Sequence, residues 1–512
     1  MRILLLRPPR LTWAHVDEET NNILPLAYPC LAAYLREKLP EVEITILDCN
    51  PIRMGFRSLH DYVRRNRFDV VGFGSETIYV YDDQKVMRWI REYHPDTKIV
   101  VGGRHYPFNP ADVFDEGLAD FIVKGEGELT FFELIREMMS ASPNYDSVEG
   151  IVWRDESGRL HDTGWREPVA NLDDLPIPAY DMVPTQIYAR RSAFFPNGIT
   201  IEHSRGCDMG CTFCTFWPQM ARWQRQADGG WKPIPLWRTK SVERTLEEVQ
   251  LLVGRYKKEM LWFVDGTFAV DLDWTEAFAD AVLKSGLKFY WFIFERAQNL
   301  LELERRGSLA NLVRAGLRHV IMGAEHPSGE VLKNLHKDPA TPEATRQVVE
   351  IFNRKYPEVL LHITYMGGAP EDDERSLKEL YRFAVSLKVD VTSFHFLTPM
   401  PGTELYERMK ERGRIKATDY RLYNWFNPVM ETDHLTIEQL DKYWGRKFLT
   451  ANLHHLGYKL KRFFTGDKMT RRILRIGALM AMRFTIKNLI MRPFRKPGEK
   501  FRSYVKPAWY DS

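Results

Sequence analysis

The stretch Gly198–Phe216, GITIEHSRGCDMGCTFCTF, decides how this 512-residue chain is interpreted. Its first four residues predict a buried strand that runs into a loop. Cys207, Cys211 and Cys214 follow in a C-x3-C-x2-C spacing. Iron–sulfur clusters are usually held by four thiolates, so three on one tight loop predict a [4Fe-4S] cluster with one iron left open for another ligand.

Two other uses of these cysteines fit the sequence less well. A zinc site could combine them with His203, but structural zinc sites normally use two separated ligand pairs, and the sequence has no second pair. A disulfide framework is disfavoured because the chain has only five cysteines. The remaining two, Cys30 and Cys49, are interpreted as buried free thiols.

The cysteine spacing, with the aromatic Phe213 before the last cysteine, resembles the radical S-adenosylmethionine (SAM) enzymes. The resemblance implies that the open iron chelates the amino and carboxylate groups of SAM. It also implies that an electron from the cluster cleaves SAM to a 5'-deoxyadenosyl radical.

Strand and helix signals alternate from residue 198 to about residue 397, which predicts a partial (β/α)6 TIM barrel within a radical SAM core at 191–430. We expect one helix over 299–315. The expected strands are Thr200–His203, Met260–Val264, Lys288–Ile293, His319–Gly323, Leu360–Tyr365 and Val391–Leu397.

Polar residues at the carboxyl ends of these strands are candidate SAM ligands by the same resemblance. Glu325 corresponds to the position that bonds the ribose, and Asp265 to the contact with the amino group. Arg296 is placed near the SAM carboxylate. The turn along the adenine corresponds to Gly367, Gly368 and Pro370. A single acidic residue at a strand end can also simply cap the next helix.

Residues 1–140 show a second βα alternation, which predicts a doubly wound, Rossmann-like parallel sheet. Ligands of such sheets bind at the carboxyl ends of the strands. The candidates at those ends are Asp48, Asn50, Gly74, Ser75, Glu76, Thr77, Gly102, Gly103, Arg104, His105, Gly125, Glu126 and Gly127.

This series resembles the cobalamin-binding domain that precedes many radical SAM domains. A dinucleotide site is disfavoured because Arg7-Pro-Pro-Arg follows the first strand instead of G-x-G-x-x-G. The remaining alternative is a sheet that binds no ligand. The usual D-x-H-x-x-G is replaced by Asp48-Cys-Asn-Pro-Ile-Arg53, so we expect no histidine from this motif under the cobalt. His105 is expected to line the pocket or cap a loop.

The connections between domains have their own signals. Residues 141–190 contain Asn171–Ala179, NLDDLPIPA, whose prolines predict an extended linker, and Ile151–Trp153 predicts a hairpin before it. The insert Pro218–Trp237 carries three tryptophans. It is either a packed surface loop or a lid over the substrate.

The carboxyl-terminal region, 431–512, is predicted to be helical and basic. Residues 441–512 hold 18 Lys or Arg against 4 Asp or Glu. An amphipathic helix here could lie on an anionic membrane through Ile473, Leu479, Phe484 and Ile490. The alternative is a helix pair packed on the barrel. Nucleic-acid binding is not expected, because no binding module accompanies the charge.

Together these features predict a cobalamin-dependent radical SAM enzyme with a [4Fe-4S] cluster, most simply a C-methyltransferase at an unactivated carbon. The alternatives are a cyclase or a lipid- or tetrapyrrole-modifying enzyme with the same cofactors, and a non-catalytic metal-stabilised scaffold or sensor. Expected partners are a small apolar substrate and a reductant such as ferredoxin or flavodoxin. Free thiols and the lack of a signal-peptide pattern predict the cytoplasm, with the inner membrane face as a further option.

Overall fold

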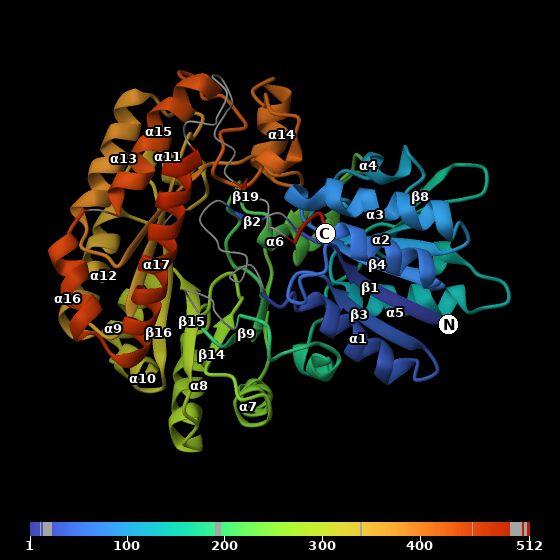
Figure 1. Ribbon diagram of the computed structural model, residues 1–512, viewed down its shortest axis with the longest axis horizontal. Helices are drawn as coiled ribbons and strands as arrows, with labels where there is room; N and C mark the ends of the chain where they lie inside the picture. Colours follow the sequence, from blue (N-terminus) through green and yellow to red (C-terminus); the bar gives the residue numbers. More distant parts are fainter. Residues whose placement is uncertain are drawn as a thin grey trace.

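The computed structural model describes residues 1–10, 12–13, 23–189, 196–337, 340–452, 454–491, 504–505 and 509–512. Two α/β units lie side by side, and carboxyl-terminal helices lie along the second unit (Figure 1). The predicted fold class is confirmed.

The first unit is a seven-stranded sheet in the order β3-β1-β4-β5-β6-β7-β8. Its first five strands in this order are parallel, as the alternation predicts. Two apolar clusters cover the two faces of the sheet, because alternate strand residues point to opposite sides. The strands are β1 Arg2–Arg7, β3 Glu43–Asp48, β4 Val70–Ser75, β5 Lys98–Gly103, β6 Phe121–Val123, β7 Ile151–Arg154 and β8 Leu160–Asp162.

Helices of this unit pack on both faces, as in a doubly wound sheet. One face carries α1 Ala27–Lys38 and α5 Gly127–Met138. The other carries α2 Phe56–Arg65, α3 Val80–Tyr93 and α4 Ala111–Phe114. The predicted hairpin is present as β7 and β8, and it pairs antiparallel with β6, so the sheet continues into the linker.

The second unit is a six-stranded parallel sheet in the order β18-β17-β16-β15-β14-β9. This is the expected partial barrel. Its strands are β9 Gly198–Ile201, β14 Met260–Phe263, β15 Tyr290–Glu295, β16 Leu317–Glu325, β17 Leu360–Gly367 and β18 Val391–Phe396. Its helices are α7 Val242–Gln250, α8 Leu272–Ser285, α9 Ala297–Arg305, α10 Leu309–Arg314, α11 Gly329–Asn334, α12 Pro342–Lys355, α13 Glu374–Ser386 and α14 Glu404–Glu411.

The expected single helix over 299–315 is wrong. The chain forms α9 and α10, separated at Gly307, whose φ is 77°. A left-handed residue ends a helix, and glycine adopts this conformation without a steric penalty.

The tryptophan-rich insert is a packed hairpin between the two units. Its strands are β11 Arg222–Arg225 and β12 Trp231–Ile234, flanked by α6 Phe216–Gln219 and by β10 Ser204–Gly206 paired with β13 Trp237–Thr239. The ring of Trp223 stacks on Trp165 of the linker at 4.0 Å and lies 6.0 Å from Phe108 of the first unit. The insert therefore joins linker, first unit and barrel.

The carboxyl-terminal region is helical, with α15 Ile437–Ala451, α16 Leu456–Thr465 and α17 Lys468–Met491. Ile473 is 1% exposed and packs in a cluster with Met469, Met260 and Leu360, so its predicted place on a membrane-facing side is wrong. Leu479 is exposed, while the side chains of Phe484 and Ile490 lie outside the described residues. None of the described helices is long and apolar enough to cross a membrane.

The last described segments contact amino-terminal parts of the chain. β19 Tyr504–Val505 pairs with β2 Thr12–Trp13. The carbonyl of Tyr510 accepts a hydrogen bond from the Phe56 amide at 3.0 Å, at the start of α2. The label C in Figure 1 accordingly lies over the first unit.

Candidate functional site

The cysteine loop lies across the carboxyl ends of the barrel strands. The Thr212 amide donates to the Leu335 carbonyl at 3.1 Å, and its carbonyl accepts from the Leu405 amide at 2.9 Å. The Cys211 thiol lies 3.6 Å from the His336 carbonyl oxygen. These contacts attach the loop to the segments that follow β16 and β18.

The thiols suit a cluster better than a single ion. Burial raises the pKa of Cys211 to about 12 and also raises the pKa of Cys207, so a bound metal is needed to hold them as thiolates. Three thiolates on one zinc ion would lie about 3.8 Å apart, given Zn–S bonds of about 2.3 Å. No three such ligands converge anywhere in the described part of the chain. A cluster instead takes each thiolate on a different iron.

Glu325 has the strongest signs of a ligand-binding residue. It ends β16 at a register shift and has a φ of 55°, which is uncommon outside glycine. One carboxylate oxygen accepts from Lys337 at 2.8 Å, while Oε2 is buried and has no partner among the described residues. A buried carboxylate oxygen without a donor fits a hydroxyl-bearing ligand such as a ribose.

Lys337 was not identified from the sequence. Burial opposes its charge, but Glu325 and the nearby thiols Cys211 and Cys214 hold its pKa above the usual range. It therefore places a partly buried ammonium group between the predicted ribose ligand and the cluster loop. No local pattern indicates this, because Lys337 lies far from the cysteines in sequence.

The glycine-rich turn after β17 lies beside the same loop. Gly368 has a φ of 86°, and its amide donates to Asp372 Oδ2 at 2.8 Å. Phe213 packs in an apolar cluster that includes Ala369. The structure thus brings the turn that contains Gly367, Gly368 and Pro370 near Phe213 of the loop. Its contact with the adenine stays a prediction.

Asp265 and Arg296 both contact the cysteine segment. Oδ1 of Asp265 accepts from the Ser204 amide at 2.6 Å and pairs with His203, whereas Oδ2 is buried without a described partner. Burial opposes the charge, yet His203 and Ser204 hold the pKa of Asp265 below its usual range. Arg296 pairs with Asp208 at 2.9 Å, beside Cys207. Asp265 therefore also anchors the start of the loop.

The candidate cobalamin edge faces the barrel. Gly74 and Glu76 are exposed at the end of β4. A side chain at Gly103 would come within 2.3 Å of the Ser75 carbonyl, so β4 and β5 approach closely there. The guanidinium of Arg104 lies 5.2 Å from the ring centre of Phe216, two residues after Cys214. The two sets of strand ends therefore adjoin.

Asp48 and Asn50 already have protein partners. Asp48 pairs with Arg7 at 3.1 Å and accepts from the Tyr188 hydroxyl at 3.0 Å. Asn50 donates to Asp48 at 2.9 Å and accepts from the Arg10 amide at 3.0 Å. Both side chains are buried, so they shape the loop around β1. Ser75 likewise donates to Asp83.

His105 is fully buried, and both ring nitrogens have partners. Nδ1 lies 3.2 Å from the Thr77 hydroxyl and Nε2 lies 2.7 Å from Asp112. The Phe108 and Asn109 amides donate to its carbonyl. His105 therefore holds the loop after β5, in line with the expected capping role.

We expect cobalamin to bind the full chain without a nitrogen ligand from His105. The expected cob(II)alamin electron paramagnetic resonance spectrum has no nitrogen superhyperfine triplet, because both ring nitrogens are engaged inside the domain. Thr77→Ser serves as a conservative control. A triplet in the wild type that disappears in His105→Asn would contradict this prediction.

A buried ion network joins the two units and was not foreseen. Arg205, two residues before Cys207, pairs with Glu128 at 2.6 Å and Glu202 at 2.7 Å. Arg238 pairs with Glu126 at 2.5 Å. Glu126 is one of the predicted cobalamin-binding residues, but its carboxylate pairs with Arg238 of the barrel domain.

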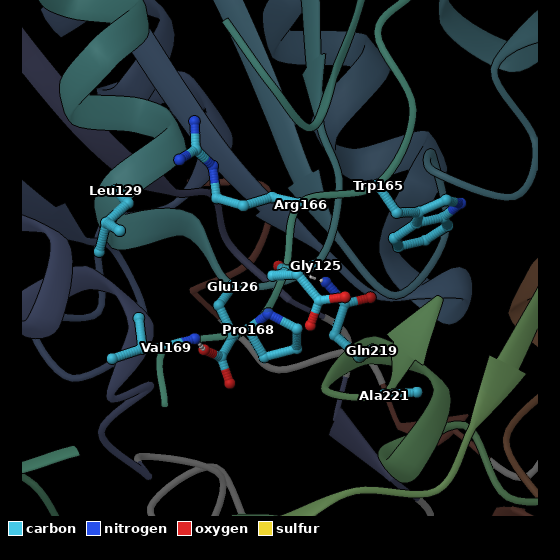
Figure 2. A pocket seen from close by; sticks show the side chains of 10 residues that line it. Gly125, Glu126, Leu129, Trp165, Arg166, Pro168, Val169, Gln219 and Ala221 are labelled. Atoms are coloured by element: carbon cyan, nitrogen blue, oxygen red, sulfur yellow. Dashed lines mark hydrogen bonds between the residues drawn. The ribbon is translucent and has the colours of Figure 1, made fainter. Parts of the chain in front are cut away.

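A small pocket opens at the same junction, shown in Figure 2. Gly125 and Glu126 come from the first unit, Trp165 from the linker and Gln219 from the cysteine segment. The Gln219 amide group donates to the Gly125 carbonyl at 2.8 Å. The predicted segment Gly125–Gly127 therefore lies at the contact between the units.

Comparison with protein-family models gives two matches. Residues 201–384 match the radical SAM superfamily, and residues 16–135 match the B12 binding domain. The chain is 27% identical to an uncharacterized methyltransferase of Pyrococcus horikoshii over 91% of this chain and 98% of that protein. It is 23% identical to the anaerobic magnesium-protoporphyrin IX monomethyl ester cyclase of Rubrivivax gelatinosus, over 94% of this chain and 82% of that one.

Solved structures share the fold over nearly the whole chain. The radical SAM methyltransferase TsrM of Kitasatospora setae, with cobalamin and a [4Fe-4S] cluster bound, gives a TM-score of 0.65 at 16% identity, over 95% of this chain and 99% of that one. The cobalamin-dependent SAM radical enzyme OxsB also gives 0.65 at 16% identity, over 98% and 82%.

Proposed function

The chain is a radical SAM enzyme with a B12 binding domain ahead of its radical SAM domain, and we propose from this that it is a C-methyltransferase acting on an unactivated carbon. One observation carries the proposal: the cysteine loop, Glu325 and the glycine-rich turn meet at one end of the barrel, and Arg104 on Phe216 brings the cobalamin edge to the same place. Its relatives include methyltransferases.

The cofactors are a [4Fe-4S] cluster, SAM and cobalamin, and when bound they supply radical generation and methyl transfer. The protein positions them. Cys207, Cys211 and Cys214 would hold the cluster, and Glu325 with the turn at Gly367–Pro370 would hold SAM. The buried ion pairs of Arg205 and Arg238 hold the two units against each other, so the sites on the two units keep their relative position.

A row of aromatic rings lies on the side of the barrel sheet where Met469 and Ile473 of α17 also pack, so it lines the barrel interior. The rings of Trp262 and Phe292 stack at 5.0 Å, and those of Phe292 and His319 at 4.3 Å. Their sequence neighbours Phe263, Ile293 and Val320 pack in the large core cluster with the barrel helices, so these rings lie on the opposite, concave side. Burial, aided by His319 and His395, lowers the pKa of His362 well below its usual value, so His362 is uncharged near neutral pH.

A second candidate keeps the same cofactors without methyl transfer. The match to the magnesium-protoporphyrin ester cyclase spans most of both chains, which supports this candidate. We further propose that ferredoxin or flavodoxin supplies the electron, and that the carboxyl-terminal region contacts the inner membrane surface.

Product mass separates the two candidates. Anaerobic incubation of the reconstituted enzyme with SAM, cobalamin, reductant and lipid or tetrapyrrole extracts is expected to give a product heavier by about 14 Da, one CH2 unit, together with 5'-deoxyadenosine. With methyl-deuterated SAM the label should appear in the product. 5'-Deoxyadenosine release with a product that never carries the label would refute methyl transfer and favour the second candidate.

A further inference from the structure

Helix α16, Leu456–Thr465, turns its polar side to the protein. Arg462 is 7% exposed, and its guanidinium pairs with both oxygens of Asp390 at 2.8 Å. It also donates to the carbonyl of Val359 at 2.9 Å. Tyr458, one turn earlier, donates to Asn353 at 2.7 Å. These charge-assisted hydrogen bonds of Arg462 fix which side of the helix faces outward.

The outward side is apolar. Leu456 is 55% exposed, Leu460 50% and Phe464 66%, and their i, i+4, i+8 spacing places them on one stripe. A surface helix normally shows the reverse arrangement, with its apolar side buried. On the neighbouring α17, Leu479 and Met482 are also more than half exposed. This apolar stripe, Leu456, Leu460 and Phe464, is accessible in the described structure.

Positive charge lies beside the stripe. At about 100° per residue, Lys461 falls on one flank, whereas Lys459 on the other flank donates to the Asn452 carbonyl at 2.9 Å and is only partly exposed. Residues 456–491 contain nine Lys or Arg and a single acidic residue, Asp467, which is paired with Arg318 at 2.6 Å. Lys461 and Lys468 are exposed. The partner must therefore offer an apolar interior and an anionic surface.

We propose that α16 docks on the surface of an anionic lipid bilayer, with the apolar stripe among the acyl chains and the exposed Lys461 and Lys468 at the headgroups. An interfacial helix has this combination of an apolar stripe, basic flanks and no spanning length. The proposal deepens the membrane contact in the proposed function by naming its surface, and it does not depend on methyl transfer. It also assigns the docking face to α16 in place of Ile473.

Flotation of the full-length, reconstituted enzyme with vesicles tests this. Wild type is expected to float with phosphatidylglycerol–phosphatidylcholine vesicles and much less with phosphatidylcholine alone. Leu460→Ser/Phe464→Ser is expected to lower the partition coefficient by roughly 10- to 100-fold, because two large apolar groups no longer leave water. Lys461→Glu/Lys468→Glu is expected to remove the preference for anionic lipid, and high salt to weaken it.

The matched control is Leu160→Ser, which removes a leucine that is 46% exposed on β8 of the first unit. It should float like wild type. Deoxyadenosine release, measured on the same samples, should be unchanged in every variant, so loss of flotation is not confused with loss of the enzyme. Equal flotation of wild type and Leu460→Ser/Phe464→Ser overturns the proposal. A lipid-free wild-type dimer that this variant loses would overturn it in favour of a second copy of the chain.

Discussion

Changing Cys207, Cys211 and Cys214 together to Ala is expected to abolish cluster binding and 5'-deoxyadenosine release. Wild type should hold about four irons and four sulfides per chain after anaerobic reconstitution, whereas the variant should hold essentially none. The reason is that no other cysteine lies in this loop, and Cys30 and Cys49 are buried elsewhere as free thiols. Iron and sulfide assays, absorbance near about 400 nm and chromatography of the nucleoside measure the effect.

Cys49→Ala is the matched control, because it removes a buried thiol of the first unit and leaves the loop intact. It should keep its iron and its nucleoside release. Normal release by the triple variant would refute the radical SAM assignment of this loop. A triple variant that stays folded and binds cobalamin, yet holds no iron, is the expected result.

Arg205→Ala is expected to destabilise the chain by about 3–5 kcal/mol, the usual cost of leaving a buried ion pair without one partner. Arg205 is 5% exposed, and its removal leaves Glu128 and Glu202 buried without their shared cation. Burial opposes the charge of Glu128, but Arg205 holds the pKa of this carboxylate below its usual range. Because Glu128 belongs to the first unit and Glu202 to the second, the loss weakens the junction directly.

Thermal unfolding with cobalamin bound measures this effect. The variant should melt earlier and lose cobalamin before the barrel unfolds. Arg222→Ala is the control, since its pair with Glu167 is more than half exposed and such pairs contribute about 1 kcal/mol or less. An Arg205→Ala protein as stable as Arg222→Ala would show that the network does not hold the units together.

Features that depend on neighbouring residues could be predicted from the amino-acid sequence. The C-x3-C-x2-C spacing, the two βα alternations and the positions of the strands to within two residues follow from residue type and periodicity over a few positions. The positions of Glu325 and Gly367–Pro370 at strand ends follow as well, because parallel strands end on one side of a sheet. The prediction of a single helix over 299–315 was wrong at Gly307, because a glycine inside a helical pattern does not show by itself whether the helix ends there.

Contacts between side chains that are distant in sequence become visible only in the folded chain. Lys337 pairs with Glu325 beside the cysteine loop, and Arg205 pairs with Glu128. No periodic sequence pattern indicates these contacts. Asp48 and Asn50 hold a loop because Arg7 and Arg10 happen to pack beside them. The orientation of α16 could not be predicted from the sequence either, because its amphipathic pattern gives two possible buried faces. The pairing of Arg462 with Asp390 shows that the polar face is the buried one. Pairing energies of buried charges depend on distance in space, and folding sets that distance.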